Sequence, residues 1–151
     1  MYKTYIFDLD GTLLNTLGDL AASTNYALRQ YGMPEHTIDD VRRFVGNGVG
    51  KLIERAIPEG LANPQYEDVL ATFRKHYMLH SLDTTAPYPG IESLLHSLRS
   101  HGCNVAVVSN KFYNATVELC RHFFSDSVDV PRGEREPLRR KPAPDSVLDA
   151  R

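Results

Sequence analysis

Two carboxylates, Asp8 and Asp10, stand two positions apart where a short apolar run ends, in the stretch FDLDGTLL. An ionised carboxylate taken out of water must be paired or bound to a metal, so a buried strand gains nothing from either residue. Residues two apart on an extended segment face the same side, and both carboxylates can therefore address one site. Such a pair suits Mg²⁺, which takes one or two carboxylates and completes its octahedron with waters and substrate phosphate.

A cation between the two carboxylates would allow phosphoryl chemistry at this loop. One carboxylate could attack phosphorus while the other moves protons. Gly11 lets backbone amides approach an anion, and Thr12 adds a hydroxyl group. The simpler alternative is a solvated turn, because Asp and Gly both favour turns. Taken alone, these four residues leave both interpretations open.

Polar side chains that could hold a phosphate recur further along the chain. Ser109 ends a second apolar run and offers a hydroxyl and a helix-start amide to a phosphate oxygen, and Asn110 follows it. The alternative for this pair is an ordinary helix cap. Lys141 could neutralise charge that develops in a transition state, although it stands beside Arg139 and Arg140, and a basic run is usually a solvated face. The prediction of a site depends on the joint order of these residues.

The elements that would position these residues can be predicted from periodicity. Residues 4–8 predict a strand, and residues 17–81 predict consecutive helices with no strand between them. Within the helical block, Thr37 and Asp40 predict a capping box, and Asn63 with Pro64 predicts the start of a longer helix.

After Tyr88-Pro-Gly90 the pattern changes to that of a parallel sheet with covering helices. Residues 104–109 form an unbroken apolar run of the kind that is buried on both faces. We expect helices over 91–102 and 115–124, a short strand near 127–130, and a last helix entered at 141–145. This order predicts an α/β fold with a helical block inserted after the first strand. Asp8 and Ser109 would both lie at the carboxyl ends of strands, where open sheets bind ligands.

Composition narrows the class of protein. The chain has 151 residues, and its 17 Lys plus Arg against 19 Asp plus Glu give a net charge of −2, which leaves no electrostatic footprint for nucleic acid. No apolar stretch approaches membrane-spanning length, and the N-terminus enters a strand-like run without a signal peptide. The two cysteines, Cys103 and Cys120, show no disulfide framework. We therefore expect a cytoplasmic protein; its oligomeric state is open.

The phrases FDLDGTLL, VVSNK and RRKPAPD, in this order and with a helical insert after the first, resemble the haloacid dehalogenase superfamily of phosphohydrolases. Within that superfamily, RRFVGNGVGKLIERA and YPGIESLLHSLRSHG are similar to the phosphoglycolate phosphatase group. The resemblance implies a Rossmann-like parallel-sheet core over residues 1–16 and 82–151. It also implies a helical cap over residues 17–81 that closes over the site.

The resemblance also implies roles for the residues. Asp8 would be the nucleophile that forms an aspartyl-phosphate, and Asp10 would protonate the leaving alcohol and then activate water. Asp8 through its side chain and Asp10 through its backbone carbonyl would bind Mg²⁺. Ser109 and Asn110 would hold the phosphoryl group, and Lys141 would pair with the nucleophile and the phosphate. The implied substrate is a small phosphorylated metabolite, with 2-phosphoglycolate the leading candidate.

The sequence departs from the superfamily pattern in one important place. The fourth motif, which supplies a further carboxylate to Mg²⁺ from a later strand, is absent, so we expect a fragment whose core is incomplete at the C-terminus. Two alternatives follow: a sugar-phosphate mutase or other-substrate phosphatase on the same scaffold, or a non-catalytic phosphate-binding module.

Two signals lie in the predicted cap. Gly46 and Asn47 form either a flexible turn or a loop that faces the substrate. His76 and His80 have a spacing that can bind zinc, but HYMLH lacks the glutamate of a zinc-protease helix, which favours a surface pair.

Overall fold

The computed structural model describes residues 2–150, which form two compact units. The first unit joins the N-terminal residues through Asn15 to the residues from Ala86 onward, and the second unit is Thr16–Thr85. Each unit is described separately below.

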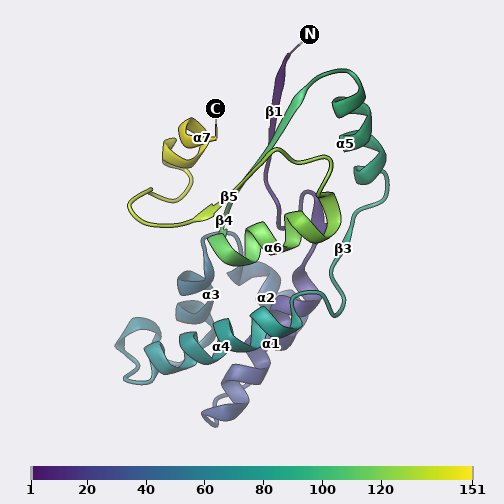
Figure 1. Cartoon of the computed structure of the whole chain (residues 1–151). Helices are drawn as coiled ribbons and strands as arrows, with labels where there is room; N and C mark the ends of the chain where they lie inside the picture. The colour runs from purple at the N-terminus through teal and green to yellow at the C-terminus, as the bar shows by residue number, and fades with distance from the viewer. Residues whose placement is uncertain (1, 151) are drawn as a thin grey trace. The chain divides into compact units, whose positions relative to one another are not determined.

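The first unit is built on a parallel sheet with the strand order β1-β4-β5 (Figure 1). Phe7, the last residue of β1, pairs with Val107, and β4 continues beyond this pair to Phe112. A short antiparallel pair, β2 with β3, joins Leu14 to Pro87. The strands of this unit are β1 (Thr4–Phe7), β2 (Leu14–Asn15), β3 (Ala86–Pro87), β4 (Asn104–Phe112) and β5 (Val130–Glu134).

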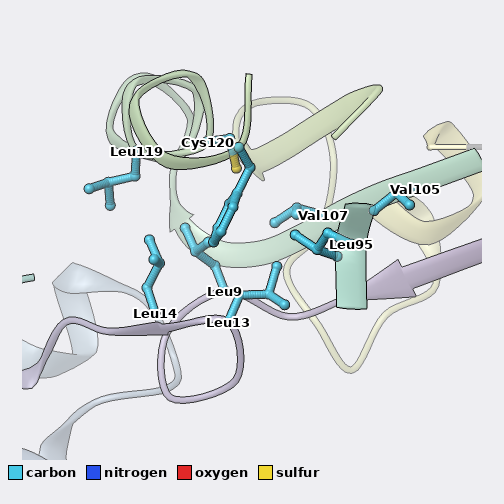
Figure 2. Packing of buried hydrophobic residues seen from close by; sticks show 9 residues of the cluster. Leu9, Leu13, Leu14, Leu95, Val105, Val107, Leu119 and Cys120 are labelled. Carbon is cyan, nitrogen blue, oxygen red and sulfur yellow. The ribbon is translucent and has the colours of Figure 1, made fainter. Parts of the chain in front are cut away.

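The central strand β4 is buried on both faces, as the apolar run predicts. Alternate residues of a strand point to opposite faces of its sheet, and here they enter two separate hydrophobic clusters. Val105 and Val107 contribute to the larger cluster (Figure 2), whereas Ala106 and Val108 pack on the opposite face with Ala150. The larger cluster also contains Leu9, Leu13, Leu14, Leu95, Leu119, Cys120 and Phe124. Its leucines anchor the loop after β1 to the core.

Three helices accompany the sheet of the first unit. The helix α5 (Ile91–Ser100) packs against β4, α6 (Tyr113–Phe124) packs against β4 and β5, and α7 (Asp145–Asp149) packs against β5. Leu95 of α5 and Leu119 of α6 are both fully buried. The predicted α/β class with a parallel sheet is confirmed.

The second unit is entirely helical, and α1 lies alongside α4 (Figure 1). The predicted capping box is present, because the Thr37 hydroxyl accepts from the Asp40 amide and the Asp40 carboxylate accepts from the Thr37 amide. Phe73 and Tyr77 are fully buried, as their place on the apolar face of α4 predicts. The helices are α1 (Leu17–Gln30), α2 (Ile38–Phe44), α3 (Val49–Ala56), η1 (Gly60–Ala62) and α4 (Tyr66–His80).

The two ends of the second unit are joined to each other by one buried carboxylate. Asp19, in the first turn of α1, accepts hydrogen bonds from the amides and hydroxyls of Thr84 and Thr85 at 2.7–3.0 Å. Burial opposes the ionisation of Asp19, but these hydrogen bonds outweigh it and lower the pKa below its usual value.

Several predicted boundaries are wrong. The strand expected to end at Ser109 continues to Phe112 as β4, so the helix expected from Ala115 begins at Tyr113 as α6. The helix expected to start at Asn63 and Pro64 begins instead at Tyr66, because the Asn63 side chain accepts from the Gln65 amide and forms a turn before the helix. The strand expected over 127–130 begins where that range ends, as β5 (Val130–Glu134). The latter includes a proline and a glycine, which an edge strand tolerates.

Among residues 2–150, no helix is both long and apolar enough to cross a membrane.

Candidate active site

The loop after β1 is folded around one backbone carbonyl. The Leu9 carbonyl accepts from the amides of Thr12, Leu13 and Leu14 at 3.0–3.2 Å. Gly11 adopts a φ of +76°, a left-handed conformation that favours glycine. Leu9 is fully buried, and its burial fixes the positions of the two aspartates that flank it.

The Asp8 carboxylate lies at the carboxyl end of β1 and is paired with Lys141. Its Oδ1 accepts from the Leu9 amide at 2.8 Å and lies 2.9 Å from Lys141 Nζ. The same ammonium donates to the Val108 carbonyl at 2.8 Å. Lys141 therefore connects Asp8, directly after β1, with Val108 in β4. The Asp8 side chain is 45% exposed and remains open to an incoming group.

Asn110 positions Lys141 through the backbone. Its Oδ1 accepts from the Lys141 amide at 2.8 Å, and its Nδ2 donates to the Lys141 carbonyl at 3.2 Å. The resemblance implied that Asn110 holds the phosphoryl group. The structure gives its side chain a further task, which is to fix the loop that carries Lys141.

Ser109 and Asn110 lie in an irregular part of β4. The pairing with β5 shifts register between Val108 and Phe112, so β4 bulges at the intervening residues. The Ser109 hydroxyl accepts from the Lys111 amide at 3.1 Å, which closes a local turn. The bulge presents hydroxyl and amide groups at the same edge as Asp8.

The bulge is packed tightly against β5 at Gly133. A Cβ added at Gly133 would lie 2.7 Å from the Lys111 carbonyl oxygen and 2.6 Å from the Tyr113 Cα. The Thr116 hydroxyl donates to the same Lys111 carbonyl at 3.3 Å. Gly133 is therefore the residue that permits the close approach of the two strands.

Sequence reasoning missed Lys111. Its side chain is only 2% exposed, and its Nζ lies 2.9 Å from Asp10 Oδ1. Buried lysines are rare unless they are paired. The one available signal was its position between the apolar strand and the aromatic pair Phe112 and Tyr113.

Cys120 of α6 lies close enough to Asp10 to respond to its charge. Burial, with a smaller contribution from the Asp10 carboxylate, raises the pKa of the Cys120 thiol to about 12. This thiol stays protonated at neutral pH.

The cap residues Gly46 and Asn47 lie in the second unit, in the turn between α2 and α3. Arg55 of α3 donates to Asn47 Oδ1 at 3.0 Å and to the Phe44 carbonyl at 2.8 Å. These contacts hold the turn together within its own unit. A substrate contact by Gly46 or Asn47 stays a prediction.

The histidine pair of α4 is held by local contacts. The rings of His76 and His80 stack with centroids 4.1 Å apart. His76 Nδ1 lies 2.9 Å from the Ser23 hydroxyl, and His80 Nδ1 lies 2.8 Å from Asp83 Oδ2. Across residues 2–150, no three His, Cys, Asp or Glu side chains gather as a metal-binding group.

The chemistry of the loop nevertheless suits a hard cation in a site that is completed by other oxygens. The accessible Asp8 carboxylate and the neighbouring loop offer only oxygen ligands, as Mg²⁺ prefers. Magnesium sites commonly use one or two carboxylates and draw their remaining ligands from waters and phosphate. The residues present therefore fit Mg²⁺.

The fold, the two aspartates of the loop after β1 and the order of the motifs together define the class of protein. The family model for haloacid dehalogenase-like hydrolases matches residues 5–151, and the chain belongs to that family. Within it, the chain is phosphoglycolate phosphatase-like. It is 33% identical over 147 residues to the phosphoglycolate phosphatase of Aquifex aeolicus, a match that covers 97% of this chain and 67% of the relative.

Two further comparisons agree. The phosphoglycolate phosphatase of Cereibacter sphaeroides is 34% identical over 146 residues, covering 92% of this chain and 66% of the relative. A crystal structure from Lactobacillus delbrueckii subsp. bulgaricus, of a protein assigned as a phosphoglycolate phosphatase, is 36% identical with a TM-score of 0.90. That alignment covers 98% of this chain and 71% of the other. The chain thus spans about two thirds of the length of the curated relatives it matches.

Proposed function

We propose that this chain carries the catalytic machinery of a phosphatase for a small phosphate monoester, with 2-phosphoglycolate the leading candidate. The observation that supports this most directly is the contact of Lys141 Nζ with Asp8 Oδ1 at 2.9 Å, at the shared carboxyl edge of β1 and β4. The substrate is suggested by the relatives, which are named phosphoglycolate phosphatases.

In the first step, an Asp8 carboxylate oxygen attacks the phosphorus atom. The bond between phosphorus and the leaving oxygen breaks, and Asp10 gives its proton to that oxygen. The products are a free alcohol and an aspartyl-phosphate on Asp8. Lys141 stabilises the negative charge that develops on the phosphoryl oxygens.

In the second step, water attacks the phosphorus of the aspartyl-phosphate. Asp10 takes the proton from this water, and the bond between phosphorus and the Asp8 oxygen breaks. Inorganic phosphate leaves, and Asp8 and Asp10 return to their starting protonation states.

Other groups at the edge would bind the phosphate. The proposal assigns the Ser109 hydroxyl, the Asn110 amide and the Gly11–Thr12 segment to the phosphoryl oxygens. Asp8 and Asp10 would hold Mg²⁺, which when bound supplies charge neutralisation for the phosphate and the carboxylate that approaches it. The cytoplasmic location inferred from the sequence stays a prediction.

The direct test is phosphate release by the purified protein from 2-phosphoglycolate and from an aryl phosphate, with and without Mg²⁺. We expect Mg²⁺-dependent release that falls by roughly 10³-fold or more in Asp8→Asn, since that change removes the nucleophile. The matched control is Asp39→Asn, an exposed carboxylate paired with Arg42 on α2, which should leave the rate unchanged.

The outcomes separate the candidate functions. Phosphate binding without turnover in either protein would contradict the phosphatase proposal and favour a binding module. Transfer of phosphate between positions of a sugar without release would favour a mutase. Turnover that survives in Asp8→Asn would exclude Asp8 as the nucleophile.

A further inference from the structure

Lys111 lies in the bulge of β4, and its side chain contacts Asp10. Its side chain is almost completely buried, and its Nζ lies 2.9 Å from Asp10 Oδ1. Removing an ammonium group from water is unfavourable unless the group is paired with an opposite charge, and here the Asp10 carboxylate is its partner. Neither the sequence motifs nor the comparisons assign a task to this residue.

The backbone around Lys111 is fixed on three sides. The Lys111 amide donates to the Ser109 hydroxyl, and its carbonyl accepts from the Thr116 hydroxyl. That carbonyl also lies where a side chain on Gly133 would collide with it. A side chain that starts from so rigid a base can hold its partner in a single orientation.

We infer that Lys111 is a positioning residue that orients the Asp10 carboxylate for proton transfer, an inference that rests on the proposed function. The contact of its ammonium with Oδ1 orients the Asp10 carboxylate so that the second oxygen, Oδ2, carries the proton. In this inference Lys111 acts through Asp10 and not by binding the substrate. Its effect is therefore confined to the steps in which Asp10 gives or takes a proton.

An aryl phosphate separates those steps. An aryl leaving group departs without protonation, so forming the aspartyl-phosphate needs little help from Asp10, whereas its hydrolysis still needs Asp10 to take a proton from water. If the hydrolysis limits turnover, kcat reports the second step and kcat/KM reports the first. Loss of the positioning should then lower kcat and leave kcat/KM unchanged.

The variant is Lys111→Met, which keeps the length of the side chain and removes its charge. With the aryl phosphate we expect kcat to fall by roughly 10- to 100-fold, a part of the 10²–10⁴-fold that acid–base catalysis typically contributes. We expect kcat/KM to stay within about twofold, since the first step is spared. Phosphoenzyme trapped by acid quenching should persist for longer than in the wild type. With 2-phosphoglycolate, both constants should fall, because its alkoxide must be protonated.

The matched control is Lys51→Met, which removes another paired lysine, 2.7 Å from Glu54 on α3. It should leave both kinetic constants unchanged. A parallel fall of kcat and kcat/KM for the aryl phosphate in Lys111→Met would overturn the inference and indicate a purely structural role. A wild-type protein that forms no phosphoenzyme would overturn the proposed function as well, which distinguishes the two failures.

A second measurement tests the ion pair without turnover. In protein labelled with ¹⁵N-lysine, a buried ammonium held by a carboxylate should give a slowly exchanging Nζ–H signal that Lys111→Met removes. Asp10→Asn should shift that signal. A signal that is unchanged in Asp10→Asn would show that Asp10 is not the partner, and the inference would fall.

Discussion

The side-chain amide of Asn110 makes two hydrogen bonds with the backbone of Lys141, one to the amide and one to the carbonyl. Such a pair holds the peptide units on both sides of the Lys141 Cα atom and so fixes the position from which its side chain starts. The position of the Lys141 ammonium beside Asp8 consequently depends on a residue in the bulge of β4.

Substituting Asn110 should therefore weaken the site through Lys141. Asn110→Ala removes both hydrogen bonds, and we expect a loss of about 1–2 kcal/mol in the free energy of unfolding and a fall of roughly 10-fold or more in kcat/KM. Thermal unfolding and steady-state kinetics measure the two effects. Asn114→Ala, at an exposed position of α6, is the control. Unchanged kinetics in Asn110→Ala would argue against this coupling.

Gly133 should tolerate no side chain. In Gly133→Ala the new Cβ meets two backbone atoms, at 2.6 and 2.7 Å, which can move only if the bulge of β4 moves with them. We expect a loss of about 1–3 kcal/mol in stability, the usual cost of overpacking, measured by denaturant unfolding. Gly50→Ala serves as the comparison, because its Cβ would meet only the end of a flexible side chain, the Tyr66 hydroxyl, at 3.1 Å. Equal stability of the two variants would refute the packing argument.

Asp19 should make stability depend on pH. Its hydrogen bonds to Thr84 and Thr85 lower its folded pKa, so its contribution is present above the unfolded pKa and is lost as pH falls through the folded one. Asp19→Ala should cost about 3 kcal/mol at pH 7, and the difference from wild type should shrink below about pH 4. Urea unfolding between pH 7 and 3 measures this.

The control for Asp19 is Asp68→Ala, an exposed aspartate in the first turn of α4. Asp68 also lies in the first turn of a helix, but its carboxylate is exposed and is not surrounded by a set of hydrogen-bond donors like that around Asp19. A pH-independent difference between Asp19→Ala and wild type would contradict the linkage.

The Cys120 thiol should not react in the folded protein. Because burial and the charge of Asp10 raise its pKa to about 12, almost no thiolate exists at pH 9. Iodoacetamide at that pH should leave Cys120 unmodified in the native state and alkylate it in urea, as peptide mass spectrometry would record. Rapid alkylation of Cys120 without denaturant would be the opposite result.

The end of β1 and the buried run of β4 could be predicted from the sequence because a change of residue type marks each of them. An apolar run that is buried on both faces has few alternatives, and the polar residues after it fall at the sheet edge wherever the strand ends. Asp8 follows the end of β1 as predicted, and Phe7 pairs with Val107. The predicted end of the second strand at Ser109 is wrong, because β4 continues through its bulge to Phe112.

Lys111 could not be predicted in the same way, because a lysine is normally read as exposed. What buries it is the register shift between β4 and β5, a tertiary feature that depends on Gly133. The predicted start of α4 was wrong for a local reason. Asn63 and Pro64 have the composition of a helix start, but the Asn63 side chain bonds to the Gln65 amide and uses its capping capacity one turn early.

The pairing of β2 with β3 has an evolutionary consequence. The chain leaves the sheet-containing unit at Asn15 and returns at Ala86, and these residues are register partners in an antiparallel pair, roughly 5 Å apart at their Cα atoms. A two-residue hairpin turn spans the same gap. The whole helical unit is thus an insertion between two paired residues of the first unit, and Asp19 joins the insertion's own two ends. Exchange of this insert between genes would leave β1 and β4, with Asp8 and Asp10, in a unit whose own strand pairings are unbroken.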